Sequence, residues 1–134
     1  MMIGIAEAFR KYSATLNNVN WSVSAWNEKG ELIVSLWAHH QLKDAPAGTL
    51  TFGDRFDRWS GHGNKEFRAN VARAFETGAP VRLVLARTLE PERVQAGEDA
   101  SNIQKTFGMR RDLVGRVTHA DETNYVIEFR KAAA

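Results

Sequence analysis

Segment 54–68, DRFDRWSGHGNKEFR, combines basic side chains, one tryptophan and two glycines just ahead of an amphipathic stretch. Arginine side chains contact the phosphate backbone of nucleic acids, and an indole ring can stack on a base. Free N–H groups at a helix N-terminus also favour a phosphate anion. We therefore expect a nucleic-acid-binding site formed by Arg55, Arg58, Trp59, Gly61, Gly63, Asn64, Lys65 and Arg68.

The same segment has a second interpretation, in which its charges satisfy one another. Asp54, Asp57 and Glu66 could pair with the arginines while Trp59 packs on the core. The run GHGNK also lacks the GK[ST] ending of a phosphate-binding loop. The binding interpretation therefore requires guanidinium groups that remain free for an external anion.

A second candidate surface lies on a predicted hairpin, whose two β-rich runs are VNWSVSAW and ELIVSLWAH. Its more polar face would carry Ser22, Ser24, Trp26, Ser35, Trp37 and His39. Such a face could bind a base, a peptide or a partner helix. Alternatively, an N-terminal helix covers it and both tryptophans belong to the core.

Basic residues of a second predicted hairpin could extend this surface. If Arg116 and Arg130 share the outer face of the sheet with Arg82, they form a basic stripe; a solvated face of alternating charges is the alternative. The predicted secondary binding face comprises Trp26, Trp37, His39, Arg116 and Arg130.

The scattered histidines and aspartates are of types that could bind a divalent metal and activate a water for hydrolysis. The candidates are His39, His40, Asp54, Asp57 and His62. However, adjacent residues on a strand point to opposite faces, and no HExxH motif is present. GxSxG and GxGxxG motifs are also missing. We expect no metal, no cofactor and a binding protein rather than an enzyme, with a metal-dependent hydrolase as an alternative.

The elements that would position these residues begin with a helix over residues 2–13, in which Ile5, Ala8, Phe9 and Tyr12 form one apolar face. In the first hairpin, Gly30 favours a type I turn with a bulge, whereas matching the apolar faces favours a two-residue turn at 28–29. We give the burial pattern more weight than the turn.

Residues 40–63 are expected to form a long connection with a short strand at 49–52. A helix capped by Asn64 then ends at Gly78 and Pro80, and a central strand follows at 81–88. The remaining predicted elements are a polar loop over 90–104 with one helical turn, a hairpin over 112–130 and a frayed tail at 130–134.

Together these elements predict a single α+β domain over residues 1–134, in the order α-β-β-(β)-α-β-β-β. We expect two helices and a curved, mostly antiparallel sheet of five to six strands, with barrel-like closure as an option.

Composition limits the remaining possibilities. The 134 residues contain 18 basic and 16 acidic side chains and no cysteine, which excludes disulfides, thiolate zinc sites and cysteine nucleophiles. The apolar N-terminal start is too short and too charged for a signal peptide or a membrane span. We therefore expect a cytoplasmic protein of a bacterial or phage-like genome that does not bind a membrane.

The function best supported by these residues is a small nucleic-acid-associated binding module. A protein-interaction or inhibitor module that uses the hairpin tryptophans is the first alternative. An edge strand of either hairpin could also pair with a second copy to form a homodimer.

Overall fold

The computed structural model describes residues 3–132 of the chain. In chain order, the helices and strands are α1 (Ile5–Arg10), β1 (Ser24–Trp26), β2 (Leu32–Trp37), η1 (Ala38–His40), β3 (Thr49–Arg55), η2 (Phe56–Arg58), α2 (His62–Thr77), β4 (Val81–Arg87), α3 (Pro91–Gln95), η3 (Ala100–Asn102), β5 (Thr106–Met109), β6 (Leu113–Ala120) and β7 (Asn124–Lys131), where η marks a 3₁₀ helix.

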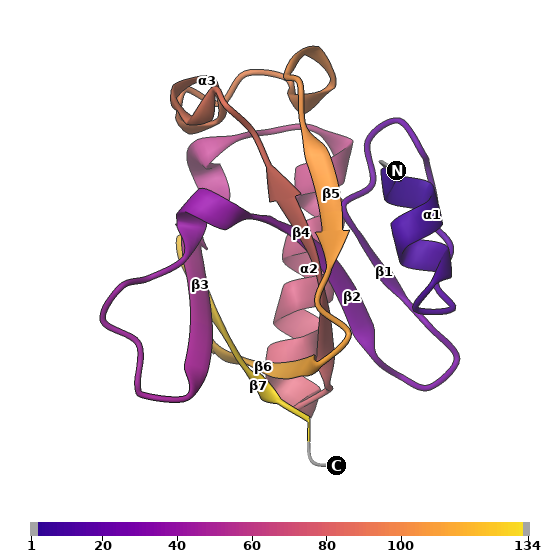
Figure 1. Ribbon diagram of the computed structural model, residues 1–134, viewed down its shortest axis with the longest axis vertical. Helices are drawn as coiled ribbons and strands as arrows, with labels where there is room; N and C mark the ends of the chain where they lie inside the picture. Colours follow the sequence, from indigo (N-terminus) through magenta and orange to yellow (C-terminus); the bar gives the residue numbers. More distant parts are fainter. Residues whose placement is uncertain (1–2, 133–134) are drawn as a thin grey trace.

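The strands form one mixed sheet in the order β1-β2-β4-β6-β7-β3 (Figure 1). Strand β5 lies off this path and pairs with the C-terminal half of β4. Strands β2 and β4 are parallel, and the other pairs are antiparallel. The predicted α+β class and the mostly antiparallel sheet are confirmed. The sheet does not close into a barrel, and residues 3–132 contain seven strands and three α-helices, more than predicted.

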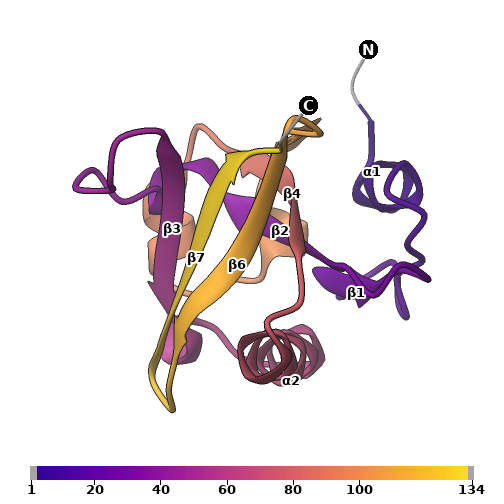
Figure 2. The ribbon, with the colours of Figure 1, turned by 90° about the horizontal axis from the view of Figure 1, so that it is seen from below.

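Helices cover both faces of the central strands, with α1 and α2 on different sides of the sheet (Figure 2). Leu32 and Leu83 belong to the core cluster under α2, whereas Ile33 and Val84 belong to the cluster under α1. All four side chains are fully buried. This two-sided burial explains the nearly continuous apolar run predicted as a central strand.

The first hairpin corrects the predicted register. Ser24 pairs with Val34, and the Gly30 N–H donates to the Asn27 carbonyl over 3.1 Å, with Gly30 at φ 77°. The turn chemistry, rather than the burial pattern, therefore sets the register, and the weight we gave to burial was wrong. Because β2 is buried on both faces, burial does not discriminate between the two registers.

Strand β1 is shorter than predicted, because the chain turns before it. The Ser22 N–H donates to the Asn18 carbonyl over 2.8 Å, so the segment 18–22 forms a turn instead of an extended strand. This segment includes Trp21, which is 36% exposed. The residues before the shortened strand thus form a loop, and its Trp21 backbone packs against Gly63 at the start of α2.

Helix α2 ends as predicted but begins differently. Gly78 closes it in the left-handed conformation, at φ 69°. At the other end Gly61, rather than Asn64, occupies the N-cap position, so the predicted cap was wrong. Asn64 lies inside the helix and its buried amide donates to the Phe56 carbonyl over 2.7 Å.

The C-terminal part contains one strand that the sequence did not predict, β5, and a longer final strand. Strand β7 continues through Lys131, and the Ala132 N–H donates to the Asp112 carbonyl over 2.9 Å. The predicted frayed tail therefore started too early, and positions 133–134 lie outside the described residues.

Candidate functional site

Two arginines of the predicted basic segment are already paired. The Arg58 guanidinium donates from Nε to Asp54 Oδ2 over 2.7 Å and from Nη1 to the Val94 carbonyl over 2.7 Å, and only 11% of its side chain is exposed. Arg55 forms two hydrogen bonds of 2.9 Å with the Asp57 carboxylate. The Arg55 hydrogen bond lowers the pKa of Asp57 below its ordinary value.

The other residues of the segment do not form a common basic surface. The Arg68 guanidinium lies 5.1 Å from the centre of the Phe56 ring, and Gly63 and Asn64 are buried. Lys65 is exposed and forms no ion pair within residues 3–132. Arg58 is therefore held by buried partners, whereas Arg55 forms an exposed pair with 63% of its side chain in solvent, and nucleic-acid binding by this segment stays a prediction.

Trp59 packs against the core cluster under α2, as the second interpretation expected, and it also lines a cleft. The cleft has a volume of about 680 Å³ and lies between the loop at 18–23, the start of α2 and the segment joining β4 to β5. We call it the aromatic cleft, because its lining includes the rings of Trp21, Trp37, His40, Trp59, His62, Phe67, Phe107 and Tyr125. Trp37 and Ala86, at the carboxyl ends of the parallel strands β2 and β4, also line it, and such ends are common places for ligand sites.

Two glycines hold the walls of the cleft close together. A Cβ at Gly63 would overlap the backbone oxygen of Trp21, and a Cβ at Gly97 would lie 2.5 Å from the backbone oxygen of Arg58. The loop at 18–23 is therefore packed on α2, and the segment after α3 is packed on η2.

Three tryptophans that line the cleft have indole N–H groups without a hydrogen-bond partner in the described residues. Within residues 3–132, none of Trp21, Trp37 and Trp59 donates a hydrogen bond from its indole nitrogen, whereas Trp26, outside the cleft, does so to Asn70 over 2.9 Å. The rings also do not stack on one another in the described part of the chain; Trp21 lies 5.6 Å from the His62 ring instead.

The charged groups of the cleft have local partners. Glu98 accepts from Arg93 at 3.1 Å, and Lys105 donates to the Ala100 carbonyl over 2.7 Å while burial lowers its pKa. Asp99 accepts from the Ser101 backbone N–H, which lowers its pKa. Together with the Arg58–Asp54 pair, these contacts make the cleft close to neutral.

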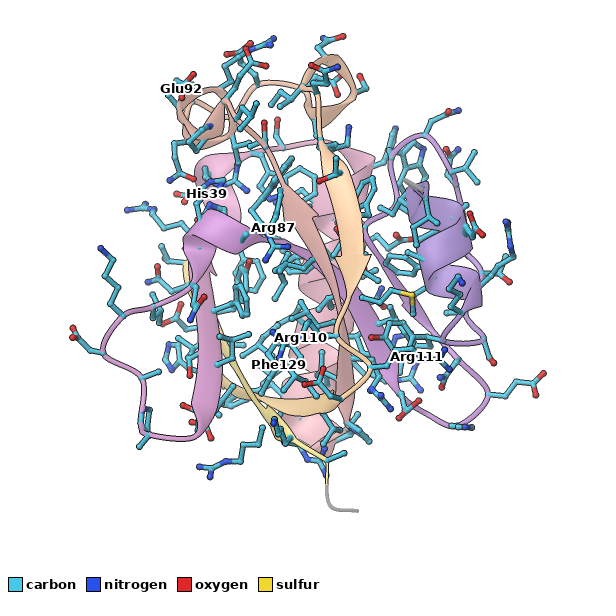
Figure 3. The ribbon with its side chains drawn as sticks, viewed as in Figure 1. His39, Arg87, Glu92, Arg110, Arg111 and Phe129 are labelled. Atoms are coloured by element: carbon cyan, nitrogen blue, oxygen red, sulfur yellow. The ribbon has the colours of Figure 1, made fainter. Side chains whose placement is uncertain are left out.

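His40 lies at the buried end of the cleft. Its Nε2 and that of His39 both contact Gln95 Oε1, the latter over 3.0 Å, while His40 Nδ1 lies 3.7 Å from Asp54 Oδ2. Burial lowers the pKa of His40 below its ordinary value. His39 lies beneath α3 (Figure 3), so the two histidines connect η1 to that helix.

The metal-site candidates do not converge. Within the described residues no group of three or more His, Cys, Asp or Glu side chains could hold a metal ion. His40 and Asp54 lie close together, but Arg58 occupies the same carboxylate oxygen at 2.7 Å.

The secondary binding face is also divided. Trp26 shares a face with Leu32 and packs towards α2, whereas Trp37 shares the opposite face with Ile33. Arg116 and Arg130 do point to the outer face of the β6–β7 pair, but Arg130 pairs with Glu128 at 2.9 Å.

Two further basic residues, Arg110 and Arg111, do not line the aromatic cleft. They lie beyond the end of β5 that is far from α3 (Figure 3).

The cleft was not predicted from the sequence, because its three tryptophans come from separated segments of the chain. Their residue type was the one sequence signal that they could share a role.

No protein-family model matches the chain, and no curated protein matches it significantly. Two solved structures are similar to it with a TM-score of 0.38: a crystal structure of KRYPTONITE in complex with mCHG DNA and SAH, at 14% identity over 99% of this chain, and one in complex with mCHH DNA, an H3(1–15) peptide and SAH, at 13% identity over 100%. The chain spans 27% of the length of both. A likeness this weak carries no functional argument. Within residues 3–132, no helix combines the length and apolarity needed to cross a membrane.

Proposed function

We propose that the protein is a non-enzymatic nucleic-acid-binding module that takes an unpaired base into the aromatic cleft. The observation that carries this proposal is the group of Trp21, Trp37 and Trp59 around one cleft of about 680 Å³. Ligand sites of this size are ordinarily concave and aromatic, with a few polar groups. Stacking a base on an aromatic side chain contributes about 1–3 kcal/mol.

The start of α2 supports a phosphate contact next to the base. Gly61, His62 and Gly63 line the cleft, and no side chain caps the N-terminus of this 16-residue helix. Lys65 lies in its first turn, exposed and without an ion pair in the described residues. A phosphate there would meet free N–H groups, the positive end of the helix dipole and an ammonium group. In this proposal the phosphate contacts Lys65 and the start of α2, a smaller contact than the predicted surface with Arg55 and Arg58.

The experiment measures fluorescence anisotropy of a labelled single-stranded oligonucleotide at low and moderate salt. We expect binding that weakens with salt and is reduced by Trp37→Phe and Trp21→Phe but not by Trp26→Phe, because Trp26 lies outside the cleft. Lys65→Gln should lower the salt slope by about 0.7, while Lys29→Gln, in the β1–β2 turn, should not.

No binding at low salt, or equal effects of the Trp26 and Trp37 substitutions, would contradict the proposal. Binding of a peptide library but of no oligonucleotide would favour the protein-interaction alternative.

A further inference from the structure

The ionised side chains that line the aromatic cleft balance in charge. Arg58 pairs with Asp54 at 2.7 Å and Glu98 pairs with Arg93 at 3.1 Å, while Lys105 and Asp99 carry opposite charges and hydrogen-bond to neutral groups. Burial raises the pKa of Tyr125, so its hydroxyl stays neutral. Because a buried ion needs a paired counter-charge, the group that enters this cleft is expected to be uncharged.

Three of the unpaired polar groups in the cleft lining can only donate hydrogen bonds. The indole nitrogens of Trp21, Trp37 and Trp59 are donors only, and none has a partner within residues 3–132. The Ser35 and Ser60 hydroxyls also line the cleft without a hydrogen bond in that range. A ligand that satisfies these donors must carry acceptors. A phenyl ring carries none, and neither does a methylated ammonium group.

We infer that the aromatic cleft binds a single uncharged nucleoside whose base presents a carbonyl acceptor, without needing a phosphate or a polymer. This rests on the proposed function and names the ligand of the same site. A carbonyl-bearing base combines the flat faces that suit unstacked indole rings with the acceptors that suit their N–H groups. The volume of about 680 Å³ leaves room for the sugar beside the base.

Contacts within the chain hold the walls of the cleft. The backbone approaches at Gly63 and Gly97 fix the loop at 18–23 and the segment after α3. A site formed before binding avoids the entropy cost of ordering loops around the ligand. A free nucleoside can therefore occupy it.

The test is calorimetric titration of the full chain with inosine and with purine riboside, which lacks the carbonyl oxygen. We expect inosine to bind about fivefold more tightly, corresponding to one neutral hydrogen bond. Its affinity should be the same at low and moderate salt, because no counterions are released.

Matched variants separate the indole N–H group from general stability. Trp37→Phe should weaken inosine binding about fivefold and remove part of the preference over purine riboside. Trp21→Phe is a second variant at a more exposed position, and Trp26→Phe is the control outside the cleft.

Equal affinities for the two ligands, or no binding of inosine while an oligonucleotide binds, would overturn this inference and leave the proposed function standing. Binding of inosine with no binding of any oligonucleotide would support the inference and contradict the nucleic-acid module.

Discussion

Trp26 and the cleft tryptophans show how the same residue type serves two regions of this molecule. Under α2, the Trp26 indole donates to Asn70, the Asn70 amide donates to Ser24, and the Arg73 guanidinium lies 4.5 Å from the ring centre. In the aromatic cleft, the indole N–H groups have no partner among the described residues. A closed network stabilises the fold, whereas an open one leaves donors for a ligand.

The buried arginine that supports the cleft should give the largest effect. Arg58→Met leaves Asp54, with 9% of its side chain exposed, without its guanidinium partner and should destabilise the fold by about 3–5 kcal/mol in urea unfolding. The matched Arg55→Met breaks an exposed pair and should leave the midpoint almost unchanged. Equal midpoints for the two variants would mean that Arg58 is not part of the rigid wall.

A side chain at Gly63 should test whether the loop at 18–23 is held by close packing. Alanine inside a helix is ordinarily favourable by about 0.5–1 kcal/mol, but here its Cβ overlaps the Trp21 backbone. We expect Gly63→Ala to destabilise the fold by about 1–3 kcal/mol and to weaken ligand binding. Gly4→Ala, which meets open space, is the control. A stabilised Gly63→Ala variant with full binding would show that the loop is not fixed.

The two kinds of tryptophan should respond differently to loss of the indole N–H. Trp26→Phe leaves Asn70 without a donor and should cost about 1 kcal/mol in urea unfolding. Trp37→Phe removes no hydrogen bond of the described residues and should cost less. A larger loss of stability for Trp37→Phe than for Trp26→Phe would contradict the distinction between the hydrogen-bonded Trp26 and the unpaired cleft tryptophans.

The smallest effect should come from pH. Burial lowers the pKa of His40 from its ordinary value of 6.5, so the folded state binds fewer protons than the unfolded state. Stability from this group is therefore complete above 6.5 and falls as the pH drops below it, towards the lower folded pKa. Urea midpoints measured below that value, but above the range where carboxylates titrate, about 4–5, should fall in the native chain.

In that range His40→Gln should flatten the pH dependence, while His39→Gln, at an exposed position, should retain it. An unchanged slope in the His40 variant would assign the pH dependence to another group.

Local sequence signals were enough for several elements. Gly78 and the Phe67–Val71 spacing fixed the end and the buried face of α2, and the alternation of Tyr125, Ile127 and Phe129 identified β7. These features depend on neighbours within one or two turns. The β1–β2 register did not follow from burial, because both faces of β2 are covered.

The site depended on contacts between distant segments, which the sequence does not specify. The pairing of Arg58 with Asp54 was considered, but its contact with Val94 comes from a residue 36 positions away. Trp21 belongs to a run predicted as a β-strand, whereas a turn places it beside His62. Strand β5 was not predicted, because it has only four residues and pairs with β4, about 20 residues earlier in the chain.

The indole region of a ¹H–¹⁵N correlation spectrum tests the central claim most directly, since the chain has four tryptophans and thus four such signals. During a titration with inosine, the signals of Trp21, Trp37 and Trp59 should shift while that of Trp26 stays in place. Four unmoved signals, or a shift confined to Trp26, would contradict a ligand site built from the open indole groups of the cleft.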